Sequence, residues 1–145
     1  MSIEKDNQQG EQLSTSLPLL LIVDDEKDIL EVCKMSLSGS FEVTTFSDPA
    51  EALDYFRTHS SQFDLVLTDI RMPKLNGFQL ARQIGSLNSN IPILFMTAFN
   101  IYPTEYQTDF PAADKDEFVQ KPDGLLEVKA RLFERMSNAK AKHKA

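Results

Sequence analysis

A short apolar run that ends in an acid, residues 65–69 (LVLTD), places the tightest constraint on how this chain folds. Leu65, Val66 and Leu67 follow one another without a polar break, as in a strand buried on both faces of a parallel sheet. Pro73 stops any regular continuation soon after Asp69. An acid at the carboxyl end of a central strand points into the crevice where open α/β sheets bind ligands. A lone strand-end Asp can equally begin a turn, so the other strand ends must decide between a site and a turn.

Four further segments have strand character, and segments of helical periodicity alternate with them. The additional strands are expected at residues 19–23, 41–46, 91–96 and 117–120. The helices are expected at residues 25–37, 49–58, 78–87 and 124–136. The first of these helices presents either Val32 or Cys33 to the core, and Ser47 or Asp48 caps the second. This alternation predicts a parallel, three-layer α/β domain with right-handed crossovers.

The length of the chain favours one domain with two tails. At 145 residues it is large enough to bury roughly two-thirds of its unfolded surface. Residues 1–17 are mostly polar and are expected to form a disordered leader. The folded domain is expected to span residues 18–137, and residues 138–145 a flexible basic tail.

Composition excludes several classes of function. A net charge of −7 and a pI near 4.8 disfavour a direct nucleic-acid partner. No apolar run approaches ~18 residues, so membrane insertion is not expected. A single cysteine rules out an internal disulfide and suits a reducing compartment. We therefore expect a cytoplasmic protein.

The carboxyl ends of parallel strands open on one edge of the sheet, and chemically active residues follow four of the five predicted strands. Three clustered carboxylates repel one another unless a cation lies among them, and an oxygen-only set suits Mg²⁺. A divalent cation, a hydroxyl and an amine are also the groups that stabilise a phosphoryl group during transfer. The residues brought to this edge are Asp24, Asp25, Asp69, Thr97 and Lys121.

The same residues carry a resemblance to the receiver domain of two-component response regulators, including the chemotaxis-regulator type. The matching features are Asp24-Asp25, the pattern Asp-x-x-Met-Pro-x-x-x-Gly over residues 69–77, Thr97-Ala98 and Lys121-Pro122. The resemblance covers about residues 18–137. It implies a flavodoxin-like three-layer sandwich, with a five-stranded parallel sheet of order 2-1-3-4-5 and about five helices.

The resemblance also implies a role for each matching residue. Asp69 corresponds to the phosphoacceptor, and Asp24, Asp25, Asp69 and the backbone carbonyl of Arg71 to the ligands of Mg²⁺. Thr97 corresponds to the switch hydroxyl, Lys121 to the phosphoryl-contacting lysine and Phe118 to an aromatic rotamer switch. The Lys121–Pro122 bond is expected to be cis. Each residue also has a structural explanation: Asp24 and Asp25 can cap the first helix, Thr97 and Phe118 can be packing residues, and Lys121 a solvated charge.

The function implied is a stand-alone receiver in a phosphorelay, a signalling protein whose only chemistry is its own phosphorylation and dephosphorylation. Its partners would be a sensor histidine kinase or phosphotransfer protein and a downstream protein effector. The alternatives are a scaffold module that does not use phosphorylation, and a relay intermediate or phosphate sink. A small phosphatase of another α/β family is disfavoured, because it would need a second acid where Arg71 stands.

One segment departs from the family pattern. Between Thr97 and Phe118 the chain has two prolines, no glycine and several poor helix formers. We therefore expect a short or irregular fourth helix, confined to about residues 104–110. The bulky Arg71 and Phe99 flank the site and are expected to slow hydrolysis of an acyl phosphate.

Overall fold

The computed structural model describes residues 16–97, 118–120 and 125–144. Its strands are β1 (Leu19–Val23), β2 (Glu42–Phe46), β3 (Leu65–Asp69), β4 (Ile93–Thr97) and β5 (Phe118–Gln120). They form one five-stranded sheet of order β2-β1-β3-β4-β5, in which every neighbouring pair is parallel. The predicted strand order is therefore confirmed.

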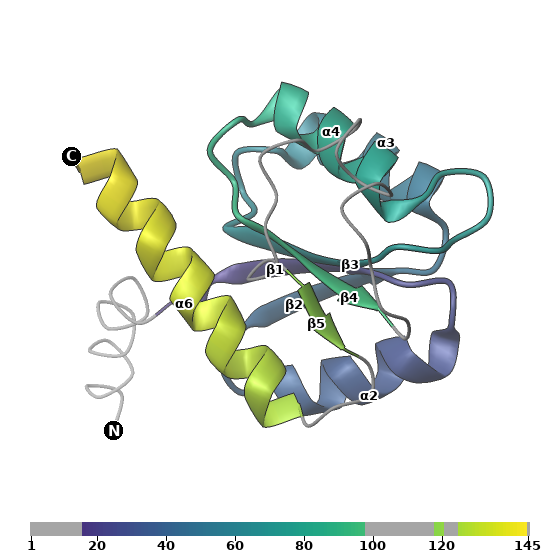
Figure 1. Cartoon of the computed structure of the whole chain (residues 1–145), viewed down its shortest axis with the longest axis horizontal. Helices are drawn as coiled ribbons and strands as arrows, with labels where there is room; N and C mark the ends of the chain where they lie inside the picture. The colour runs from purple at the N-terminus through teal and green to yellow at the C-terminus, as the bar shows by residue number, and fades with distance from the viewer. Residues whose placement is uncertain (1–15, 98–117, 121–124, 145) are drawn as a thin grey trace, which may run out of the picture.

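Within the described ranges, helices cover both faces of the sheet, two on each (Figure 1). The helices are α2 (Lys27–Leu37), α3 (Pro49–His59), α4 (Gly77–Leu87) and α6 (Leu125–Lys144). Helices α2 and α6 pack on one face, and α3 and α4 pack on the other. Strand β1 is buried on both faces, which explains why its sequence is continuously apolar. Leu20 and Ile22 pack in the α2/α6 layer, whereas Leu21 and Val23 pack in the α3/α4 layer.

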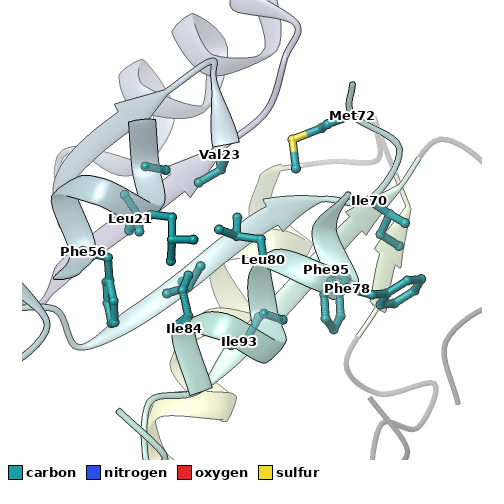
Figure 2. Close-up of a cluster of buried hydrophobic side chains, with 14 of the residues drawn as sticks. Leu21, Val23, Phe56, Ile70, Met72, Phe78, Leu80, Ile84, Ile93 and Phe95 are labelled. Carbon is teal, nitrogen blue, oxygen red and sulfur yellow. The ribbon is translucent and has the colours of Figure 1, made fainter. Parts of the chain in front are cut away.

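The core on the α3/α4 side reaches the loop that follows β3. Phe56 of α3 and Ile84 of α4 are fully buried in this layer, as Figure 2 shows. Ile70 and Met72, which lie directly after the end of β3, are buried in the same cluster. Their burial anchors the β3–α4 loop to the core, so the residue at the end of β3 sits on a fixed base.

Local signals set where α3 and α4 begin. Asp48 is the N-cap of α3, where its Oδ1 accepts a hydrogen bond of 2.9 Å from Ala50 N–H, and Pro49 is the first helical residue. This settles the choice between Ser47 and Asp48. Asn76 begins α4 with a capping box: its Oδ1 accepts from Gln79 N–H, and Gln79 Oε1 accepts from Asn76 N–H, each at 2.9 Å.

Three details go beyond the sequence prediction or correct it. Cys33, not Val32, faces the core: Cys33 is buried, whereas Val32 is 50% exposed. Strand β4 includes Thr97. Helix α6 continues to Lys144, so the expected helix end at Met136 was wrong, and the structure has helix where a flexible tail was expected. Alanine and lysine favour helix in residues 137–144, and positive charge suits a helix C-terminus.

The described residues contain four of the roughly five predicted helices. The predicted irregular helix at residues 104–110 and the Lys121–Pro122 bond lie outside the described part of the chain. Within the described ranges, none of the helices combines the length and the apolar character that crossing a bilayer requires.

Candidate functional site

Three carboxylates meet at the carboxyl edge of the central strands. Asp24 and Asp25 follow β1, and Asp69 is the last residue of its neighbour β3. One carboxylate oxygen from each lies within 4.8 Å of the other two. Asp24 and Asp69 are buried, whereas Asp25 is exposed to solvent. The strand-end convergence predicted for these three residues is therefore present in the structure.

Helix capping explains little of this acidic pair. The N-cap residue of α2 is Glu26, and its side chain makes no capping hydrogen bond. Asp24 Oδ1 accepts a hydrogen bond of 2.9 Å from Glu26 N–H, which orients the carboxylate at the start of the turn. The bond to Glu26 does not explain why Asp24 is fully buried beside two other acids. Burial next to like charges costs free energy, and a bound cation offsets such a cost.

The donor set fits a hard divalent cation. Among the described residues, the side chains that could bind it supply carboxylate oxygens, from two buried residues and one exposed residue. Oxygen ligands of this kind suit Mg²⁺ and Ca²⁺ rather than the softer transition metals. The exposed position of Asp25 leaves one side of the cluster open to solvent, as a site with water ligands or a reacting group requires.

Main-chain contacts hold Asp69 in place. Its Oδ1 accepts a hydrogen bond of 2.8 Å from Ile70 N–H, which orients the carboxylate. Its carbonyl oxygen accepts a hydrogen bond of 2.8 Å from the hydroxyl of Thr68, which is completely buried. Sequence reasoning missed this role of Thr68. The available signal was a hydroxyl inside an otherwise apolar buried strand, because a buried hydroxyl needs a hydrogen-bond partner.

Gly77 allows the start of α4 to approach the end of β3. Its N–H donates to Ile70 O at 2.8 Å. A Cβ at this position would stand 2.2 Å from the Asp69 carbonyl oxygen and 2.9 Å from Ile70 Cα. The last residue of the Asp-x-x-Met-Pro-x-x-x-Gly pattern is therefore glycine for a steric reason: helix α4 begins in contact with the backbone of Asp69.

An ion pair joins the loop between β3 and α4 to the start of α3. Lys74 adopts a left-handed backbone conformation, with φ 73°. Its Nζ lies 3.3 Å from Oδ2 of Asp48, the N-cap of α3. The hydrogen bond from Ala50 N–H, aided by Lys74, holds the pKa of the Asp48 carboxyl below its ordinary value. The pair links the loop after β3 to the loop after β2.

The remaining predicted residues lie at different depths. Thr97 is buried at the end of β4, one residue beyond Met96, which pairs with Asp69. Phe118 pairs with Phe95 across β4 and β5, and its ring stacks on Phe95 with a centroid distance of 5.3 Å. Side chains two residues apart on a strand point to the same face, so Thr97 lies on the same face of β4 as Phe95. Thr97 and Phe118 therefore share the α3/α4 face of the sheet.

Arg71 is exposed in the β3–α4 loop, and Lys121 and Phe99 lie outside the described residues.

The sequence is similar to those of known response regulators. The sequence model of the response regulator receiver domain matches residues 20–133. Response regulator SaeR of Staphylococcus epidermidis is 32% identical over 130 residues, which are 86% of this chain and 54% of SaeR. Two-component response regulator ARR14 of Arabidopsis thaliana is 34% identical over 88 residues, covering 61% of this chain and 23% of that protein. The chain thus spans about half, or less, of these curated relatives.

Solved structures agree with the strand order and the layers. A response regulator receiver domain protein from Clostridium thermocellum superposes with a TM-score of 0.73 at 27% identity, covering 88% of this chain and 98% of that one. A CheY-like receiver domain protein from Methanospirillum hungatei has the same fold, with a TM-score of 0.77 at 24% identity and coverage of 88% and 99%. Together with a family match that spans nearly all of the sheet and the acidic cluster at its edge, these likenesses show that this chain belongs to the family of response regulator receiver domains.

Proposed function

We propose that this receiver domain accepts a phosphoryl group on Asp69 from a phosphohistidine of a sensor histidine kinase or a phosphotransfer protein. The observation that carries the proposal is the clustering of Asp24, Asp25 and Asp69 at the edge where the central strands end. A buried acid at the end of β3, fixed by its own loop, suits a nucleophile better than a turn residue. We place this exchange in the cytoplasm, where cysteines such as the buried Cys33 stay reduced.

In this proposal Asp24, Asp25, Asp69 and the backbone carbonyl of Arg71 hold Mg²⁺. When bound, the cation supplies positive charge that offsets repulsion between the carboxylates and the incoming phosphoryl oxygens. The oxygen-only donor set and the open side at Asp25 support this assignment.

The chain itself supplies positioning. A carboxylate oxygen of Asp69 attacks the phosphorus atom, forming an O–P bond while the P–N bond to the histidine breaks. The histidine nitrogen keeps the electron pair of the broken bond and takes a proton from solvent. The hydrogen bond from Ile70 N–H and the burial of Met72 hold Asp69 still, which reduces the entropy cost of reaching the in-line geometry.

The proposed output is a shift between two conformations. The Thr97 hydroxyl and the Lys121 ammonium donate hydrogen bonds to the new phosphoryl oxygens. Thr97 and Phe118 share one face of the sheet, so movement of Thr97 toward the phosphoryl group leaves room for the Phe118 ring to turn inward. A downstream protein effector would read the altered surface. The domain would catalyse no reaction beyond its own phosphorylation and dephosphorylation.

Intact-mass spectrometry after incubation with a small acyl phosphate donor tests the proposal. The expected result is a single phosphoryl adduct that requires Mg²⁺ and is absent in Asp69→Asn. Asp54→Asn is the matched control, because it removes an exposed carboxylate on α3. An adduct in Asp69→Asn at the wild-type level would refute the assignment. Absence of an adduct with both the small donor and a phosphorylated histidine protein would favour the scaffold alternative.

A further inference from the structure

Arg131 of α6 bonds to the main chain of the residue proposed to switch. Its Nη2 donates a hydrogen bond of 2.9 Å to Phe118 O. Its Nη1 lies 3.7 Å from Glu127 Oε2, one turn earlier on the same helix. The Arg131 side chain is 21% exposed, so it is largely buried. A charged donor in such a place makes a stronger hydrogen bond than a neutral donor does.

The strand that Arg131 contacts lies at the edge of the sheet. Strand β5 pairs with β4 and is the last strand in the order of the sheet. The structure describes β5 over Phe118–Gln120, and an edge strand forms ladder hydrogen bonds with a neighbour on one side, whereas a central strand forms them on both. The bond from α6 therefore adds a further contact to a strand that pairs with β4 alone in the sheet order.

Phe118 is held from both faces of the sheet. Its ring belongs to the α3/α4 side, where it stacks on Phe95 and meets Phe78 edge-on with a centroid distance of 6.2 Å. Its carbonyl oxygen is held by a side chain from α6, which covers the opposite face (Figure 1). The rotamers open to a side chain depend on the backbone torsions beneath it. A contact that fixes the Phe118 main chain therefore limits which ring positions are available.

We infer that Arg131 is a positioning residue that couples α6 to the Phe118 ring. The inference rests on the proposed function in one respect, namely that the Phe118 ring changes position when Asp69 is phosphorylated. Displacement of α6 by a partner would shift the equilibrium between the two positions of the Phe118 ring. Phosphorylation would in turn favour displacement of α6, and the coupling free energy is the same in both directions. Glu127 assists by orienting the guanidinium.

Four proteins test the inference: wild type, Arg131→Met, Arg131→Lys and Lys129→Met. Methionine keeps an unbranched apolar stem but removes the donors, and lysine restores a charged donor. Lys129→Met removes a positive charge from the same helix as a control. Aromatic carbon signals of Phe118 and the amide signal of Val119 are recorded by NMR, first without additions and then with beryllium fluoride and Mg²⁺ as a phosphoryl mimic.

Arg131→Met should move the Phe118 and Val119 signals in the unloaded protein and reduce their response to the mimic by at least about twofold. Arg131→Lys should recover part of that response, and Lys129→Met should behave as wild type. Signals and response unchanged in Arg131→Met would overturn the inference. If Arg131→Met does not fold, a wild-type response in Arg131→Leu, which also lacks a donor, overturns it. If wild type forms no adduct and does not respond to the mimic, the proposed function fails, while the unloaded spectra still test the positioning role.

Discussion

The contact between Gly77 and the backbone of Asp69 makes a sharp quantitative prediction. In Gly77→Ala the new methyl carbon would lie 2.2 Å from the Asp69 carbonyl oxygen, whereas ordinary contacts begin at 3.4 Å. The two groups must therefore separate by about 1.2 Å, the difference between those distances. The Gly77 backbone fixes the position of the Cβ and the atom it meets is a main-chain oxygen, so no side-chain rotation relieves the contact.

The cost follows from what must move. Separating α4 from β3 loses the hydrogen bond from Gly77 N–H to Ile70 O, worth about 1 kcal/mol. Forced repacking of a close contact costs a further 1–3 kcal/mol, approximately. We therefore expect Gly77→Ala to lower the free energy of unfolding by about 2–4 kcal/mol. The displaced segment carries Asp69, so phosphorylation should slow as well.

Gly85 provides a control on the same helix. A Cβ at Gly85 meets nothing within 4 Å, and the residue lies in the last turn of α4. Gly85→Ala should therefore raise the free energy of unfolding by about 0.5–1 kcal/mol, the usual helix preference for alanine. Urea unfolding followed by circular dichroism measures both variants, since the chain has no tryptophan. Equal stability of the two variants would refute the steric reasoning.

Three further predictions concern the surroundings of the site. Thr68→Val should cost about 1–2 kcal/mol in urea unfolding and slow the phosphorylation of Asp69, whereas Thr68→Ser, which keeps the hydroxyl, should change neither much. Asn76→Ala should cost about 1 kcal/mol by loss of the capping box, and Asn76→Asp should retain most of that stability. The pKa of Asp48 is lower in the folded than in the unfolded protein, so its ionised form contributes stability that is present above the unfolded pKa and is lost as pH falls through the folded pKa. Between about pH 6 and about pH 3, wild type should lose more stability than Asp48→Asn, and an equal loss would contradict this.

The layer architecture could be predicted because its determinants are local patterns. The continuous apolar sequence of β1 indicated burial on both faces, and the structure places Leu20 and Leu21 in opposite layers. The strand order itself came from the resemblance, since periodicity alone does not choose between sheet orders. Asp48 and Pro49 marked the start of α3, because a capping side chain and a proline act within one turn.

Details that depend on tertiary contacts could not be predicted. Val32 and Cys33 both fitted the apolar face of α2, and only the direction in which α2 packs made Cys33 the buried one. The end of α6 was placed too early, because the apolar pattern ends near Met136 while helix propensity continues beyond it.

The acidic cluster was predictable, but its support was not. The positions of the strand ends predicted that Asp24, Asp25 and Asp69 lie close together, and the structure confirms that grouping. Two of the bonds around the site join residues that are far apart in sequence, Lys74 with Asp48 and Arg131 with Phe118, and nothing in the sequence indicated those pairs. Gly77 was visible as part of a pattern, but its steric role required the position of the Asp69 carbonyl.

The identity of the acceptor residue is the central claim, and reductive trapping tests it most directly. The protein is phosphorylated with Mg²⁺ and a small acyl phosphate donor and then treated with borohydride, which reduces an acyl phosphate of aspartate to homoserine. Peptide mass mapping then locates the converted residue. The account predicts homoserine at position 69 alone, dependent on Mg²⁺. Conversion at Asp24, Asp25 or any other acid, with Asp69 unchanged, would contradict it.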